Sequence, residues 1–235
     1  MIGTIVNTVA IVAGSGIGLL FKKNFPEKYE TIYFQAVGLF TVLLGVKMSL
    51  DVASPLLVVL SLILGGFAGV WLKLNEKVEH LGSFIKSRTK SKNDRFTEGL
   101  TTGFLLFCMG SMTIVGCIEE GLNGQTSDLL LTKSVMDFFS SIMLALALGI
   151  GVMFSAVLLF LFQGGITLLV SLLGKGIAPE IINEITVVGG IILIGLSFVL
   201  LKIKNIEIIN FLPSLLLICL FVRLKLLLLS LGFTI

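Results

Sequence analysis

The polar residues best placed to do chemistry lie inside an apolar stretch that begins near Leu129. Lys133, Asp137, Ser140 and Ser141 follow at helical spacing, so a helix places them on one face. A charge at the centre of a membrane helix costs about 2.5–3.5 kcal/mol on insertion scales, so an aspartate there needs a reason. A lysine–aspartate pair with two hydroxyls can bind a cation, relay a proton or hold a zwitterion. The alternative is that Lys133 and Asp137 lie near the outer membrane interface and extend their charged ends into water.

A glycine-rich helix expected over about 97–118 is the second place where chemistry is predicted. Gly110 and Ser111 lie inside it, where a break would free backbone groups to meet an ion or a substrate. The alternative is that its glycines only permit close packing against other helices.

Amide side chains inside apolar runs complete the candidate site, because an amide in lipid needs partners and should face the bundle interior. Asn7, Gln35 and Gln163 are of this kind. They either join helices together or line a polar path. The predicted substrate-binding or ion-binding residues are Asp137, Ser140, Ser141, Lys133, Gly110, Ser111, Asn7 and Gln35.

The sequence contains few residues that could act in catalysis. His80 is the single histidine, and the three cysteines lie far apart without a metal-ligand spacing. A histidine-based metal site and a serine–histidine triad are therefore not expected. We predict no catalytic residues, no metal, no cofactor and no nucleic-acid partner.

The elements that position these residues follow from composition. Of 235 residues, 56% are hydrophobic and 13% are charged, and the mean hydropathy is +1.09. Soluble domains carry roughly 25% charged residues, so this chain cannot coat a water-soluble globule. The composition predicts an all-α polytopic membrane protein, with the lipid bilayer as its partner.

Eight apolar runs are long enough to span a bilayer. They cover about 2–21, 32–50, 55–74, 97–118, two spans within about 129–173, and then 181–201 and 207–228. A polar loop is expected over 119–128, after the fourth span. The fifth and sixth are separated at Gly149-Ile-Gly151. Seven spans result if the tight turn over 149–153 is absent.

Basic residues set the predicted orientation, because cytoplasmic loops carry an excess of lysine and arginine. With eight spans, twelve of the 17 basic residues fall on one side, seven of them in the 75–96 segment and its edge at Lys73. We therefore expect this segment in the cytoplasm and both termini outside. No basic residue precedes Lys22, which argues against a cleaved signal peptide.

The 75–96 segment has apolar residues at helical spacing, starting from Leu74 and Val78. This pattern predicts an amphipathic helix along the inner membrane surface, with lysines toward anionic lipid. A solvated hairpin is the alternative.

A weak internal similarity links residues 17–45 with 166–195. Both contain an I-x-L-L helix end, a loop with Lys and Pro-Glu, and an apolar helix with related glycines. The chain would then divide into a first three-helix repeat (1–74), the cytoplasmic segment (75–96), central helices (97–153) and a second repeat (154–235). The two loops fall on opposite faces, and inverted repeats are typical of secondary transporters. Chance similarity between Leu- and Gly-rich helices is the alternative.

Short motifs spread along the chain carry a family resemblance. They lie at Gly3–Asn7, Gln35–Leu39, Glu98–Gly99, Leu105–Gly110, Gly116–Gly124, Lys133–Asp137 and Val188–Gly190. With these, nearly the whole chain resembles the bacterial membrane proteins grouped as domain of unknown function 554. The resemblance implies a polytopic inner-membrane protein, and it brings no catalytic site or substrate. We expect least correspondence after about Arg223.

Together these features predict a small secondary transporter or permease of the bacterial cytoplasmic membrane, acting on a small solute or ion, with coupling to a cation left open. A homodimer is expected, with the glycine faces at Gly14/Gly18 and Gly65/Gly69 as its interface. The alternatives are a non-transporting scaffold or regulator that acts through the basic 75–96 segment, and an ion channel.

Overall fold

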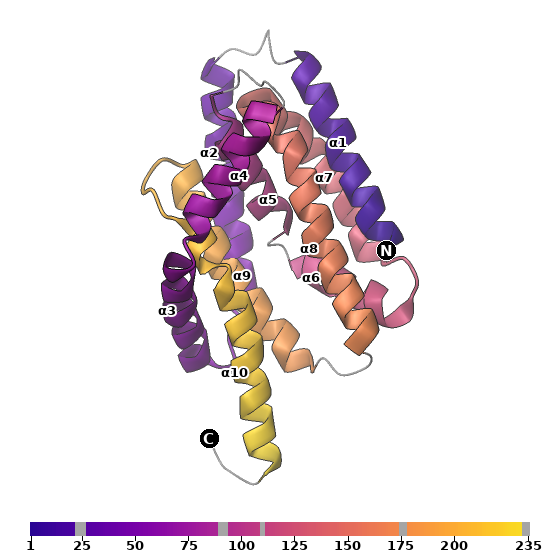
Figure 1. Cartoon of the computed structure of the whole chain (residues 1–235), viewed down its shortest axis with the longest axis vertical. Coiled ribbons are helices and arrows are strands. Elements are labelled where there is room, and N and C mark those ends of the chain that lie inside the picture. Colours follow the sequence, from indigo (N-terminus) through magenta and orange to yellow (C-terminus); the bar gives the residue numbers. More distant parts are fainter. Residues whose placement is uncertain (22–26, 89–93, 109–110, 174–177, 232–235) are drawn as a thin grey trace. The chain divides into compact units, whose positions relative to one another are not determined.

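The computed structural model describes residues 1–21, 27–88, 94–108, 111–173 and 178–231, and the regular elements in these ranges are helices (Figure 1). They are α1 (Ile2–Phe21), α2 (Glu27–Ser49), α3 (Pro55–Trp71), α4 (Leu74–Arg88), α5 (Phe96–Cys108), α6 (Ser111–Asn123), α7 (Asp128–Leu148), α8 (Gly151–Leu173), α9 (Pro179–Leu200), the 3₁₀ helix η2 (Ile208–Phe211) and α10 (Pro213–Ser230). The predicted all-α class is confirmed.

Glycine and proline set the helix boundaries that matter for the site. Pro55, Pro179 and Pro213 open α3, α9 and α10, where a missing N–H removes no intrahelical hydrogen bond. Gly149, with φ of 83°, separates α7 from α8 at the predicted place. Gly124, with φ of 68°, follows the end of α6. The polar loop expected over 119–128 is therefore wrong at its start, because α6 continues to Asn123.

Five helices of the described chain are long and apolar enough to cross a membrane. They are Ile2–Phe21, Asp128–Leu148, Gly151–Leu172, Pro179–Leu200 and Ile208–Ser230. Two bent pairs, α3 with the start of α4 and α5 with α6, raise the number to seven if each is one span. The predicted count of eight is not confirmed.

Large apolar side chains cover the outer helix faces. Trp71 on α3 is 83% exposed and Leu20 on α1 is 80% exposed. In water such a surface would aggregate, whereas in lipid it is the ordinary outer face of a membrane protein.

The chain forms two compact units. Unit 1 contains residues 1–37 and 78–176, and unit 2 contains residues 38–77 and 177–235. The helices α2 and α4 each contribute residues to both units.

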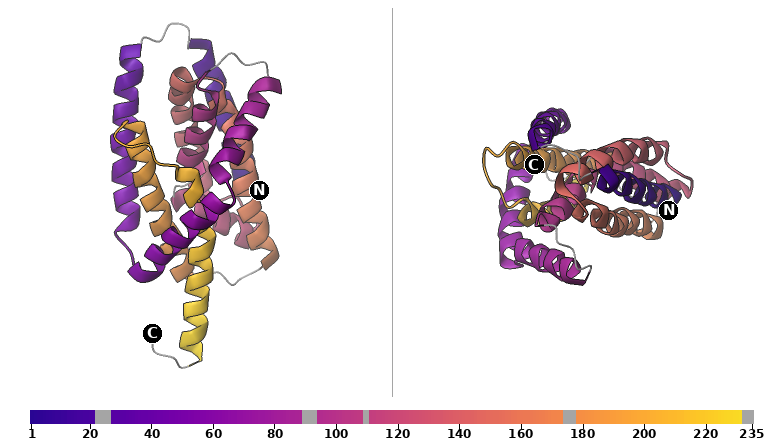
Figure 2. Two further views of the ribbon diagram at one scale, coloured as in Figure 1. Left: turned by 60° about the vertical axis from the view of Figure 1, so that its left-hand side comes forward. Right: turned by 90° about the horizontal axis from the view of Figure 1, so that it is seen from above.

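In unit 1, α1 lies between α7 and α8 (Figure 2, view from above). It runs parallel to α7, because Gly3 meets Leu130 and Gly18 meets Ala145 further along both helices. It runs antiparallel to α8, because Gly164 in the second half of α8 meets Met1, while Gly16 in the second half of α1 meets Met153. Small residues on α1 thus allow backbones to approach closely.

The other face of α8 packs on α5 and then on α6, again in parallel. Gly103 of α5 meets Ser155 early in α8, and Gly121 of α6 meets Thr167 and Val170 later in α8. Unit 1 therefore contains two parallel helix contacts, α1 with α7 and α8 with α5 and α6.

Unit 2 is built on two antiparallel contacts. Gly45 of α2 and Gly190 of α9 face each other, and a Cβ on either glycine would lie 2.7 Å from the other's carbonyl oxygen. Gly69 near the end of α3 packs on Asn210 just before α10. At the other end of the same pair, Lys225 of α10 donates a hydrogen bond of 2.8 Å to Ser54 Oγ.

Candidate functional site

Asp137 of α7 is the centre of a buried polar cluster in unit 1. Its Oδ2 accepts hydrogen bonds from Lys133 Nζ at 2.5 Å and from Asn7 Nδ2 of α1 at 3.0 Å. Asp137 is 5% exposed, Lys133 is 6% exposed and Asn7 is fully buried. The sequence placed the lysine and the aspartate one turn apart, and the parallel packing of α1 on α7 adds the amide.

Lys133 is enclosed by protein. Its Nζ lies 6.0 Å from the centre of the Phe107 ring of α5, which offers the negative face of its π system to the ammonium. The pair with Asp137 thus lies inside the helix packing, and the lysine does not extend to the surface of the unit. Charges buried this deeply are retained in membrane helices mainly where they have a task.

The break expected in the glycine-rich helix lies beside this pair. The helix α5 ends at Cys108, α6 begins at Ser111, and the two axes differ by 61°. The freed carbonyl of Phe107 accepts a hydrogen bond of 3.0 Å from Thr113 Oγ1, so part of the broken backbone is satisfied within the chain. Gly110 and the side chain of Ser111 lie outside the described residues.

The other predicted site residues are not hydrogen-bonded to Asp137. Ser141 is buried, donates to the Phe138 carbonyl at 2.8 Å and packs against Gly14. Ser140 is half-buried, and Gln35 is exposed on α2. The structure therefore brings together Asp137, Lys133 and Asn7, while Ser141 contributes to the contact between α1 and α7.

Glu120 is a buried carboxylate that was predicted to lie in the polar loop over 119–128. It is 2% exposed on α6, and its Oε1 accepts the Gly3 N–H at 2.8 Å and lies 3.3 Å from the Met1 amine. The helical spacing of Thr113, Cys117 and Glu120 was the signal that could have found it.

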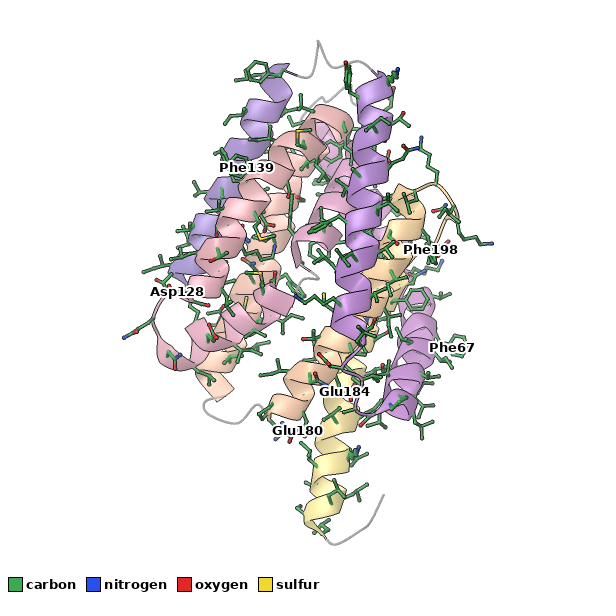
Figure 3. The ribbon with its side chains drawn as sticks, turned by 180° about the vertical axis from the view of Figure 1, so that it is seen from behind. Phe67, Asp128, Phe139, Glu180, Glu184 and Phe198 are labelled. Atoms are coloured by element: carbon green, nitrogen blue, oxygen red, sulfur yellow. The ribbon has the colours of Figure 1, made fainter. Side chains whose placement is uncertain are left out.

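Unit 2 has its own buried carboxylate, Glu184 on α9 (Figure 3). Glu184 Oε1 accepts the Ala53 N–H at 3.0 Å, and the neighbouring Asn183 donates to the Asp51 carbonyl at 2.7 Å. Both side chains therefore hold the connection between α2 and α3. Neither residue was predicted as a functional residue, because nothing in the local sequence marks a contact so distant along the chain.

The chemistry available in the site is polar binding. Among the described residues, no group of three or more His, Cys, Asp or Glu side chains could hold a metal ion. The cluster in unit 1 instead offers a fixed pair of opposite charges and the Asn7 Oδ1 atom, which is buried and makes no hydrogen bond with the described residues. Such an atom is expected to meet water or a ligand.

Comparison with known proteins agrees with the resemblance carried by the short motifs. Residues 2–223 match the family model described as protein of unknown function (DUF554), so the match stops where least correspondence was expected. The uncharacterized membrane protein YdfK of Bacillus subtilis is 40% identical over 220 residues, which cover 92% of this chain and 93% of YdfK. The uncharacterized protein YqgA of Escherichia coli is 28% identical over 224 residues, covering 92% and 94%. No solved structure matches. The chain is therefore a helical membrane protein that belongs to the DUF554 family.

Proposed function

We propose that this protein is a small secondary transporter of the bacterial cytoplasmic membrane, with its substrate site at Asp137, Lys133 and Asn7. The observation that carries the proposal is the buried ion pair itself. Apolar residues at the same positions would pack without the desolvation penalty of two charges. A charged group of a solute can replace either Lys133 or Asp137 as the partner of the other residue. Asn7 Oδ1 adds a hydrogen-bond acceptor beside the pair.

Helix directions within each unit support an inverted repeat. The helices α1 and α8 are antiparallel in unit 1, and the pairs α2/α9 and α3/α10 are antiparallel in unit 2. These are the helices that the internal similarity paired as first and second repeat. The parallel contacts also correspond. The helix α1 of the first repeat packs parallel to α7, and its counterpart α8 in the second repeat packs parallel to α5 and α6. This arrangement suits a transporter built from two oppositely oriented halves.

The membrane topology follows from the same proposal. Counting α2 and α3 as one span each, together with the five long helices and the bent pair α5 and α6, gives eight. The basic 75–96 segment then lies in the cytoplasm and both termini lie outside.

A homodimer is part of the proposal, but its interface differs from the one expected. Gly14 and Gly18 pack on α7, and Gly65 and Gly69 pack on Ser214 and Asn210, all within one chain. The interface must therefore use other outer faces.

The test is a ligand screen on detergent-purified protein. Thermal unfolding is measured with Na⁺, K⁺, amino acids, polyamines and carboxylates, on wild type, on Asp137→Asn and on Asp128→Asn. Asp128 is the matched control, because it is an exposed carboxylate at the start of the same helix (Figure 3). We expect a solute that stabilises wild type and Asp128→Asn but not Asp137→Asn, and that is taken up by vesicles containing wild type.

Two outcomes contradict this proposal. If no solute stabilises the protein and deletion of residues 75–96 abolishes its cellular role, the scaffold or regulator is the better description. If flux is seen without saturation, the protein is a channel.

A further inference from the structure

Unpartnered polar atoms gather near the N-terminal end of α1 in unit 1. Side-chain atoms buried and without a hydrogen-bond partner among the described residues include Thr4 Oγ1, Glu120 Oε2, both amide atoms of Gln163, and Thr167 Oγ1. The thiol of Cys117 on α6, a weak hydrogen-bond donor, lies beside Thr167 Oγ1. Buried polar groups are normally satisfied, so this many in one region points to a ligand.

Contacts between three helices bring these residues together. Gly3, next to Thr4, donates its N–H to Glu120, which joins α1 to α6. The backbone of Gly121, next to Glu120, lies against Thr167, which joins α6 to α8.

The third contact closes the triangle. Gly164 of α8 lies against Thr4 and Met1, and Gln163 is its neighbour in the chain. The helices α1, α6 and α8 thus meet pairwise at Glu120, Thr167 and Thr4, and Gln163 is adjacent in sequence to the third of these contacts.

The oxygens have the chemistry of a ligand set for a hard cation. One carboxylate, two hydroxyls and one amide carbonyl offer four oxygens with a single formal negative charge. We propose that Glu120 Oε2, Thr4 Oγ1, Gln163 Oε1 and Thr167 Oγ1 bind one monovalent cation of the size of Na⁺. The single carboxylate favours a monovalent ion, because a divalent ion usually gathers more acidic ligands.

The charges that face the site are consistent with this assignment. The Met1 amine lies 3.3 Å from Oε1, the oxygen that also accepts the Gly3 N–H, and the Met1 side chain is 44% exposed. Lys133 is the other nearby cation, and its charge is matched by Asp137 at 2.5 Å. Glu120 Oε2 is therefore the carboxylate oxygen that remains for an additional cation.

The site deepens the proposed transport function by giving the coupling ion a place of its own. Asp137 Oδ2 already accepts two hydrogen bonds, from Lys133 and Asn7. Thr4 and Asn7 lie one turn apart on α1. A cation that fixes the position of Thr4 therefore also fixes the position of Asn7 in the substrate site. This role rests on the proposed function, whereas cation binding does not.

The experiment measures cation binding on the full chain in detergent, without any flux. Thermal unfolding is followed while NaCl replaces choline chloride at constant ionic strength, and KCl and a series of pH values are run in parallel. At Na⁺ of 100 times its dissociation constant, the folded-to-unfolded ratio should rise about 100-fold, with a Tm that increases and follows the binding isotherm.

Variants identify the ligands. Thr167→Val keeps the side-chain shape and should lose most of the Na⁺ response while folding normally. Glu120→Gln should lose it as well. Glu119→Gln is the matched control, because Glu119 is the adjacent carboxylate on α6 and bonds Ser127 at 2.7 Å, so its response should equal that of wild type.

An equal response of Thr167→Val and wild type, or the absence of any Na⁺ response, overturns the site. Stabilisation by acid alone would assign the position to a proton and also overturns it. Na⁺ binding without solute flux leaves the site standing and refutes the transporter. Solute uptake that is independent of Na⁺ in a protein that binds no Na⁺ refutes the site and leaves the transporter standing.

Discussion

The two units bury carboxylates in different ways. In unit 2, Glu184 accepts a backbone N–H from the α2–α3 connection, beside an asparagine and a lysine that hold the same connection. In unit 1, Asp137 meets a lysine and an amide from another helix, and Glu120 lies among side chains with unpartnered atoms. Glu120 and Glu184 each use Oε1 to accept a backbone N–H, and Oε2 of each has no hydrogen-bond partner among the described residues. What distinguishes them is the surroundings, because the helices that meet at Glu120 also carry the unpartnered side-chain oxygens of Thr4, Gln163 and Thr167.

The largest expected effect comes from separating Asp137 from Lys133. Asp137→Ala leaves the lysine buried without its counter-charge and should destabilise the protein by about 3–5 kcal/mol. The double variant Lys133→Met with Asp137→Leu removes both charges and should restore most of that loss. Urea or thermal unfolding in detergent measures both changes.

The double variant also tests the comparison between the units. If the pair serves binding, the folded double variant loses ligand stabilisation and uptake. A double variant that folds and transports like wild type would show that the pair has only a structural role, like the role assigned to Glu184 at the α2–α3 connection.

Much of this architecture was accessible from sequence, because composition and long apolar runs determine how a chain meets lipid. The α7–α8 boundary was predicted, since Gly149 has a backbone conformation that other residues avoid. The pair Lys133–Asp137 was also predicted, because its members are one turn apart in one helix.

Contacts between distant segments were not accessible in the same way. Asn7 joins Asp137 only because α1 packs along α7, and Glu184 reaches Ala53 across 131 positions of sequence. Glu120 was missed for a different reason, since its neighbours suggested a polar loop and only the continued helix of α6 buries it. Two adjacent glutamates read alike in sequence, while in the structure one is buried.

A smaller effect is expected at the glycines that pack the helices, and it should be alike in both units. A Cβ at Gly14 would meet Ser141 Oγ and the Phe138 carbonyl, and a Cβ at Gly69 would meet the Asn210 carbonyl. Gly14→Ala and Gly69→Ala should each cost about 1–3 kcal/mol in unfolding experiments, since the helices must move apart.

Gly165→Ala is the control for these two variants. Apart from its chain neighbours and its own helix backbone, no atom of the described residues lies within 4 Å of a Cβ built there, so the change should be neutral or stabilise the protein by about 0.4–1 kcal/mol through a less flexible unfolded chain. Equal losses at all three glycines would mean that helix contacts are not what these residues provide.

The smallest effect is expected at Glu184, and it tests whether the buried glutamates of the two units differ in their response to Na⁺. Glu184→Gln keeps an oxygen for the Ala53 N–H, so it should change unfolding stability by no more than about 0.5–1.5 kcal/mol, the net contribution of one hydrogen bond. Because the charge of Glu184 has no assigned ligand, Na⁺ response and uptake should stay at wild-type levels, in contrast to Glu120→Gln. Thermal unfolding with and without Na⁺ measures both quantities on the same samples. If Glu184→Gln instead abolishes the Na⁺ response while its stability is unchanged, unit 2 also takes part in ion binding, and the carboxylates of the two units have the same role.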